Sequence, residues 1–151
     1  MRNDIKIEVF KRKDEREVFR LLSQAELPVK DLTDDKFKNF LIARAKDGSV
    51  VGAIGVERYQ DVGLLRSLVV HPSHREQGLG KQLVYELESY AQSKGIKTIF
   101  LLTITAADFF RKLGYEVIQR TRVPASIVKT EEFKNICPVS AVCLLKNLKP
   151  T

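Results

Sequence analysis

The residues best suited to chemistry lie in one stretch, 64–80, which reads LLRSLVVHPSHREQGLG. Its end, the segment 75–80, follows an apolar β-branched run and precedes a helical pattern. Glycines let a backbone turn tightly and approach a ligand closely. The unpaired N–H groups of a first helical turn attract an anion, as does the helix dipole. Strand, glycine-rich turn and helix together therefore predict a phosphate-binding loop.

Two familiar phosphate-binding motifs are absent from the chain. There is no G-x-x-x-x-G-K-[ST] loop, and no G-x-G-x-x-G followed by an acidic residue about 20 positions later. What remains is R-x-x-G-x-G at 75–80, preceded by L-V-V-H-P and followed by an amphipathic pattern. In this context the motif resembles the acetyl-CoA motif of the GNAT acetyltransferase superfamily.

The resemblance implies a set of cofactor-binding residues. Backbone groups of the strand ending in V-H-P would hydrogen-bond the pantetheine arm of acetyl-CoA, although aliphatic residues in a strand equally suit a core. The loop would hold the pyrophosphate with N–H groups at the start of the following helix. The implied pantetheine residues are Leu68, Val69 and Val70, and the implied pyrophosphate residues are Arg75, Gln77, Gly78, Leu79, Gly80 and Lys81.

A second block, 101–115, resembles the superfamily pattern A-x-x-F-Y-x-x-x-G-F and implies cofactor contacts at Thr103 and Phe109. Two positions depart from the superfamily. Phe110 stands where many members have a tyrosine that protonates the leaving CoA thiolate, and Thr103 stands where asparagine is common. Because a thiolate of pKa roughly 8.5 leaves tolerably without a general acid, the first departure does not exclude catalysis.

The implied reaction is attack of a neutral amine on the acetyl thioester. An aliphatic amine with a pKa of roughly 10.4 is mostly protonated at neutral pH and must lose a proton. Glu57 is the best candidate for the base, although an acid near a strand end is more typical of solvated surface. Leu64 stands where relatives that acetylate amino acids often carry a glutamate. A backbone N–H near Val69 could polarise the thioester carbonyl.

Arg66 is the least expected residue of the central strand. A charge inside an apolar strand is unfavourable unless it is paired. We therefore expect Arg66 either to pair with a carboxylate such as Glu57 or to bind an anionic substrate. Both alternatives would place a charged group beside the central strand.

Hydrophobic periodicity and turn signals indicate the elements of the first half of the chain. Gly52 and Gly55 inside one strand suggest a bend or bulge. We expect a strand at 4–10 with Ile5, Ile7 and Val9 on one face, a helix at 14–24, a short helix capped by Thr33, strands at 40–44 and 50–59 joined by an Asp47-Gly48 hairpin, a turn at 61–63 and a central strand at 64–70.

The second half alternates helices with strands. We expect a helix from about Gly80 to a capping Gly95, a strand at 98–102, a helix capped by Thr105 and ended by Gly114, and a strand at 115–120. The segment 124–137 reads as irregular or briefly helical, and 140–145 as the last strand.

The resulting order is β-α-α-β-β-β-α-β-α-β-β, which is also that of the GNAT fold. We expect an α/β (α+β) protein with a mixed, mostly antiparallel sheet of six to seven strands and about four flanking helices. A chain of 151 residues predicts one domain spanning 1–151. In the GNAT fold the central strand and the next splay apart at one end, where the cofactor enters.

The net charge and the composition limit the classes of molecule that the protein is expected to bind. A net charge of +7 fits nucleic acid or a polyanionic cofactor, and we rank nucleic acid last because no nucleic-acid motif is present. No apolar run could span a bilayer and the first residues are not a signal peptide, so a cytoplasmic location is expected. Cys137 and Cys143 are expected to be reduced thiols, and two cysteines make a poor metal site, so no metal is expected.

The C-terminal segment RVPASIVKTEEFKNICPVSAVC, with the two blocks above, resembles N-acetyltransferases of arsenic-resistance gene clusters, which are related to amino-acid N-acetyltransferases. The expected function is therefore acetyl transfer from acetyl-CoA to a small amino-acid-like amine, with a homodimer possible by analogy. The alternatives are acetylation of a protein N-terminus or lysine, and a catalytically silent acetyl-CoA-binding regulatory module.

Overall fold

A computed structural model describes residues 5–75, 78–130, 133 and 141–148. The described helices are α1 (Glu15–Gln24), α2 (Asp34–Phe37), α3 (Leu79–Ser93), α4 (Ala107–Lys112) and α5 (Ala125–Val128), with short 3-10 turns η2 (Arg12–Asp14), η3 (Pro72–His74) and η4 (Arg120–Arg122). The strands are β1 (Lys6–Val9), β2 (Phe40–Arg44), β3 (Val50–Tyr59), β4 (Val62–Val70), β5 (Thr98–Thr103), β6 (Glu116–Ile118) and β7 (Val142–Asn147).

The seven strands follow the order β1-β2-β3-β4-β5-β7-β6, and the sheet is mixed because β4 and β5 run parallel while β1–β2, β2–β3, β5–β7 and β6–β7 are antiparallel pairs. This confirms the expected fold class. The contacts form two compact units, which we call the N-terminal unit (Met1–Val56 and Ser67–Ser89) and the C-terminal unit (Glu57–Arg66 and Tyr90–Thr151). The expectation of a single domain stays a prediction.

The N-terminal unit has an antiparallel ladder with a helix on each face. The apolar stripe of α1, which includes Val18 and Leu22, is buried against residues of β2 and β3. Phe37 of α2 extends this core, because its ring stacks on Phe10 with centroids 4.5 Å apart. On the other face, a Cβ at Gly52 would lie 3.1 Å from a methyl carbon of Leu83 in α3. Glycine therefore allows α3 to approach β3 closely.

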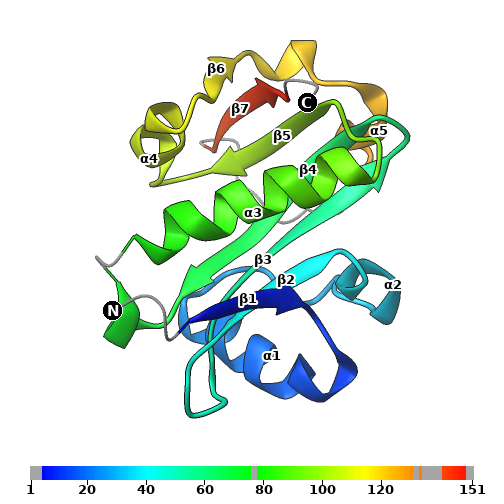
Figure 1. Cartoon of the computed structure of the whole chain (residues 1–151). Coiled ribbons are helices and arrows are strands. Elements are labelled where there is room, and N and C mark those ends of the chain that lie inside the picture. Colours follow the sequence, from blue (N-terminus) through cyan, green and yellow to red (C-terminus); the bar gives the residue numbers. More distant parts are fainter. Residues whose placement is uncertain (1–4, 76–77, 131–132, 134–140, 149–151) are drawn as a thin grey trace. The chain divides into compact units, whose positions relative to one another are not determined.

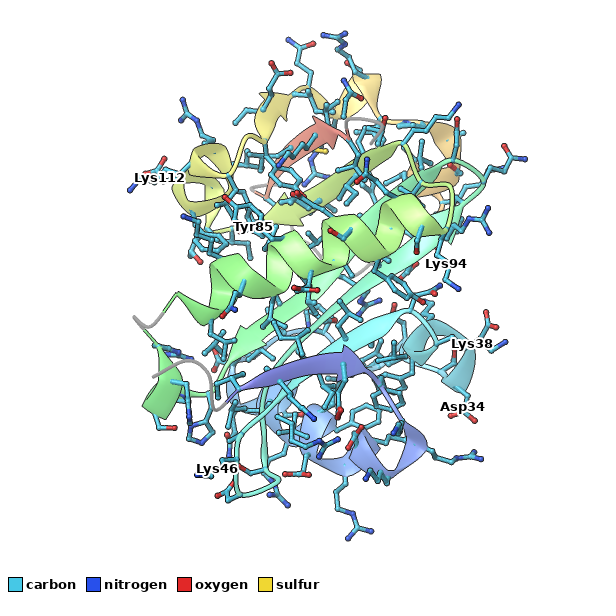
Figure 2. The ribbon with its side chains drawn as sticks, in the orientation of Figure 1. Asp34, Lys38, Lys46, Tyr85, Lys94 and Lys112 are labelled. Carbon is cyan, nitrogen blue, oxygen red and sulfur yellow. The ribbon has the colours of Figure 1, made fainter. Side chains whose placement is uncertain are left out.

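The β2–β3 hairpin agrees closely with its sequence pattern. Gly48 has a φ of +93°, as expected of the glycine in an Asp-Gly turn, and Lys46 marks this turn in Figure 2. The register then shifts, because Ala43 pairs with Gly52 whereas Arg44 pairs with Val50. One extra residue on β3 is a bulge, which confirms the expectation from the glycines.

The C-terminal unit is built around β5, which pairs with the start of β4 on one side and with β7 on the other (Figure 1). Its core cluster contains Leu64, Phe100, Val123, Ile127 and Cys143. β6 pairs only three residues with β7. The last strand and α5 therefore supply much of the surroundings of Leu64.

Three boundaries differ from the sequence expectations. The strand expected at 115–120 is shorter, since β6 ends at Ile118 and η4 follows. The turn expected at 61–63 is the pair Gln60–Asp61, with Gln60 at a φ of +59°. The apolar residues at 62 and 63 belong to β4, because pairing with Thr98 and Ile99 extends the strand backward.

Two side chains also differ from their expected roles. Thr105 does not cap α4; instead Thr103 Oγ1 accepts the Ala106 N–H at 2.9 Å. Val9 is 47% exposed, although it was expected on the half-buried face of the first strand. Arg44 forms a 3.0 Å ion pair with Glu8. This edge strand therefore does not have one apolar, buried face and one polar, exposed face.

Cys143 is a free, buried thiol, and burial raises its pKa to about 11. Cys137 lies outside the described residues, as does Ser140, the first residue expected in the last strand. Within the described ranges, no helix combines the length and apolar character needed to cross a membrane. The same residues hold no cluster of three or more His, Cys, Asp or Glu side chains that could bind a metal ion.

Candidate active site

The backbone of β4 changes conformation at Ser67. The strand begins in register with β5, where Leu64 pairs with Phe100. Three residues later Ser67 has a φ of +63°, which is uncommon for a residue with a side chain and is typical of a bulge or a functional site. The residues that follow, 68–70, are those expected to bind pantetheine. Val69 is buried in the core of the N-terminal unit, while its two neighbours are half-buried.

The turn after β4 is held by short-range hydrogen bonds. Pro72 begins η3, and His71 Nδ1 accepts the Ser73 N–H at 3.1 Å. The Ser73 hydroxyl also lies 2.8 Å from Nδ1 of His74. Both histidines thus have hydrogen-bond partners within the turn. Arg75 Nε donates to the Val70 carbonyl at 3.1 Å, which ties the loop to the end of the strand.

The start of α3 has the features expected of an anion site. Gly78 has a φ of +77° and open space where a Cβ would be, and the helix begins at Leu79. No acidic residue lies in the first turn, so nothing there opposes a negative ligand. Lys81 is exposed, and its ammonium lies 5.7 Å from the ring centroid of Tyr85, which is labelled on α3 in Figure 2. Gln77 lies outside the described residues.

The C-terminal unit contains a buried charge cluster, which we define as Glu57, Tyr59 and Arg66. Arg66 Nη1 donates to Glu57 Oε2 at 2.7 Å, and the two side chains are 0% and 4% exposed. The Tyr59 hydroxyl donates to Glu57 Oε1 in a short hydrogen bond. The first alternative for Arg66, pairing with Glu57, is therefore observed. The competing interpretation of Glu57 as solvated surface is wrong, because pairing with an arginine from the next strand buries it.

The charge cluster lies near Leu64, which stands where relatives that acetylate amino acids often carry a glutamate. Side chains alternate along a strand, so Leu64 and Arg66 project from the same face of β4. Tyr59 packs against the core cluster that contains Leu64. Every buried side-chain nitrogen or oxygen in the described part of the chain has a hydrogen-bond partner, so this buried cluster is electrostatically satisfied. Glu57 thus places a carboxylate on the face where Leu64 supplies none.

The block around α4 explains how the chain accommodates Phe110. Its ring meets Phe109 and Tyr115 edge to face, with centroids 5.0 and 5.4 Å away. Phe110 is buried, whereas Phe109 is only half-buried. The position expected to carry a general-acid tyrosine is therefore a core position here. Thr103 uses its hydroxyl to accept the Ala106 N–H, which fixes the entry to α4.

Sequence reasoning assigned no particular role to Tyr59. The available signal was its spacing from Glu57, because residues two apart on a strand share a face. Ser67 was likewise not expected to have a positive φ. An apolar strand pattern carries no local mark of such a backbone conformation.

The comparisons with known proteins agree with this architecture. Residues 5–115 match the model of the acetyltransferase (GNAT) family. An amino-acid acetyltransferase of Pseudomonas fluorescens is 39% identical over 66 residues, which is 44% of this chain and 15% of that protein. An uncharacterized N-acetyltransferase of Chlorobaculum tepidum is 30% identical over 94 residues, or 62% of this chain and 59% of that protein.

The fold is also found in a solved structure. N-acetylglutamate synthase from Neisseria gonorrhoeae, complexed with coenzyme A and N-acetyl-glutamate, superposes with a TM-score of 0.84 at 18% identity, covering 97% of this chain and 35% of that one. The chain thus matches only a small part of the amino-acid acetyltransferases it resembles. The expected kinship with amino-acid acetyltransferases is confirmed, and the narrower resemblance to arsenic-resistance enzymes stays a prediction.

Proposed function

Because the chain belongs to the acetyltransferase (GNAT) family, we propose that it transfers the acetyl group of acetyl-CoA to an amine. The observation that carries the proposal is the start of α3. There the R-x-x-G-x-G loop, the positive φ of Gly78 and a first turn without acids form a ready anion site. Coenzyme A is bound in the structure of the Neisseria relative, which supports the same cosubstrate here.

We assign cofactor binding to the residues implied by the family motifs. The pantetheine arm would bind the backbone after Ser67, which has a positive φ, and the pyrophosphate would bind the N–H groups at the start of α3. The proposed pantetheine residues are Leu68, Val69 and Val70; the proposed pyrophosphate residues are Arg75, Gln77, Gly78, Leu79, Gly80 and Lys81; Thr103 and Phe109 are further proposed contacts.

The proposed chemistry is direct attack of the amine nitrogen on the thioester carbonyl, with no metal. A backbone N–H near Val69 would stabilise the developing oxyanion. Glu57 would accept the proton that the amine must lose. The CoA thiolate leaves without a tyrosine acid, since Phe110 has no hydroxyl, and its pKa of roughly 8.5 makes this tolerable.

The acceptor we favour is a small amino-acid-like molecule. The 39% identity to an amino-acid acetyltransferase supports this class. Acetylation of a protein N-terminus or lysine remains the second candidate within the same chemistry. A catalytically silent acetyl-CoA-binding module is the third, and Leu64 and Phe110 favour it because both lack the groups used elsewhere in the family. We also propose a cytoplasmic location, where acetyl-CoA is available, and a homodimer by family analogy.

The first experiment is titration of the protein with acetyl-CoA by calorimetry, followed by a panel of amino acids, their analogues and short peptides in an assay of thiol release. We expect saturable binding and turnover on a free amino acid or analogue. Turnover on peptides alone would favour the second candidate, and tight binding without turnover the third. Failure to bind acetyl-CoA would overturn the proposal.

A further inference from the structure

The buried charge cluster suggests how a proton leaves the acceptor. We propose that Tyr59 is a proton relay between the acceptor amine and Glu57, and that Arg66 is a positioning residue that holds the Glu57 side chain in place. This inference rests on the proposed acetyl transfer and specifies its proton path. It assigns a function to Tyr59. It also assigns Arg66 to the orientation of the Glu57 carboxylate and not to substrate binding.

The geometry makes direct contact between an amine and Glu57 unfavourable. The Glu57 side chain is only 4% exposed, and each of its oxygens already accepts a hydrogen bond, Oε2 from Arg66 and Oε1 from Tyr59. Tyr59 is half-buried, whereas the Arg66 side chain is 0% exposed, so Tyr59 is the more accessible of these two partners of Glu57. An incoming amine, or a water that it protonates, would therefore meet Tyr59 before Glu57.

The proposed step balances in one concerted transfer. The Tyr59 hydroxyl gives its proton to Glu57 Oε1, and the phenol oxygen receives a proton from the ammonium or from an intervening water. Tyr59 ends as a neutral phenol, Glu57 as a carboxylic acid, and the amine as the neutral nucleophile. After the neutral amine has attacked the thioester, the second proton on its nitrogen passes to the departing CoA thiolate. The proton on Glu57 then returns to solvent by the reverse path.

Arg66 acts through Glu57. Its side chain is fully buried and donates to the carboxylate, so contact with a substrate would require the pair to open. The guanidinium therefore fixes the orientation of Glu57, whose other oxygen accepts the hydrogen bond of Tyr59. In the adjoining core cluster, Cys143 stays a neutral thiol because burial raises its pKa to about 11, and Arg120 donates to the Ala141 carbonyl. Neither competes for the proton.

The test compares Tyr59→Phe with Tyr90→Phe, which removes a hydroxyl from another half-buried tyrosine of the same unit. For both variants and the wild type, kcat and KM for the amine are measured from pH 6 to pH 10, with the acetyl-CoA affinity by calorimetry. We expect Tyr59→Phe to lower kcat about 100-fold at neutral pH with unchanged acetyl-CoA affinity. The loss should shrink as the pH rises through the pKa of the amine, where no proton need be removed. Tyr90→Phe should match the wild type.

Arg66→Lys supplies a second readout, because it keeps the charge and loses the planar guanidinium. We expect kcat to fall while KM for the amine changes little, because a misplaced Glu57 affects proton removal and leaves amine binding intact. A raised KM for the amine with an unchanged kcat would show that Arg66 binds substrate and would overturn its positioning role.

The outcomes separate this inference from the proposed function. Wild-type turnover with an equally active Tyr59→Phe, or a loss that is the same at every pH, would overturn the relay and leave the acetyltransferase standing. A wild type that turns over no amine would overturn both. A Tyr59→Phe variant that loses activity and unfolds at a lower temperature is resolved by the pH dependence, since instability alone would not restore activity at high pH.

Discussion

At the scale of single residues, Phe110 and Leu64 lack the side-chain groups that could act as acid or base, so any such group must come from neighbouring residues. Phe110 stands where the resemblance implies a tyrosine in many members of the family, and Leu64 where it implies a glutamate in many amino-acid acetyltransferases. Both residues are buried in the core. Because both side chains pack in the core, each has a structural role, and its presence does not by itself indicate loss of catalytic activity. The charge cluster of Glu57, Tyr59 and Arg66 lies on the same face as Leu64 and offers a carboxylate by a different route.

Restoring the tyrosine at position 110 should not restore a general acid. The Phe110 ring packs edge to face between Phe109 and Tyr115, so a new hydroxyl would enter apolar surroundings. We expect Phe110→Tyr to lower the free energy of unfolding by about 1–3 kcal/mol and to leave kcat no higher. Urea denaturation and steady-state kinetics check this, and a rise in kcat would show that the acid is missing and the position reaches the leaving group.

The Cys143 thiol predicts a loss of stability in alkali. Its pKa is raised by burial from the ordinary 9.0 to about 11, so the neutral form is favoured in the folded chain. This contribution is complete below the unfolded pKa and is lost as the pH rises through the folded one. We expect the unfolding free energy to fall more between about pH 9 and about pH 11 in the wild type than in Cys143→Ala. Parallel urea midpoints for the two proteins would contradict it.

At the scale of elements, the turn between β4 and α3 combines a tied loop with an open helix start. Arg75 anchors the loop to the carbonyl of Val70, and Gly78 leaves the first helical turn uncovered. The sheet side of the same unit has α3 packed closely over Gly52. The helix is thus placed by its packing on β3, and the proposed pyrophosphate site is its first turn.

A glutamate at position 78 should remove acetyl-CoA binding. Gly78→Glu puts a side chain and a negative charge at the helix start, where both oppose a pyrophosphate. Gly48→Glu is the matched control, because Gly48 also has a positive φ and open space around its missing Cβ. We expect similar small losses of stability in both variants and loss of acetyl-CoA binding by calorimetry only in Gly78→Glu. Unchanged affinity in Gly78→Glu would refute the site.

At the scale of the whole molecule, a net charge of +7 favours a polyanionic ligand. Acetyl-CoA carries several phosphate charges, so its association should be steered by this charge. The two compact units each have their own core, and β3, β4 and α3 contribute residues to both.

Salt should therefore weaken acetyl-CoA association. We expect the association rate, measured by stopped-flow fluorescence, to fall about tenfold between low and high ionic strength. The catalytic rate at saturating acetyl-CoA should change little. A rate independent of salt would contradict electrostatic steering. Steeply salt-dependent binding of a DNA or RNA duplex would revive the nucleic-acid alternative.

The sequence by itself determined the features that depend on neighbouring residues. The Asp47-Gly48 turn, the Thr33 cap, which accepts the Lys36 N–H at 3.3 Å, and the strand at 40–44 all follow local rules and are found as expected. The family motif at 75–80 is also local. Such patterns act through backbone dihedrals and through hydrogen bonds between residues a few positions apart. They can therefore be predicted without knowledge of the fold.

Only the tertiary structure decided the arrangement of charges and caps. Glu57 meets Arg66 because two strands lie side by side, and their separation of nine positions gives no local signal. Thr103 replaces Thr105 as the hydroxyl at the entry to α4, since the end of β5 sets the direction of the chain. The positive φ of Ser67 is likewise not indicated by the apolar pattern of its strand. Burial and long-range pairing outweigh local preference at these positions, and the proposed proton relay depends on them.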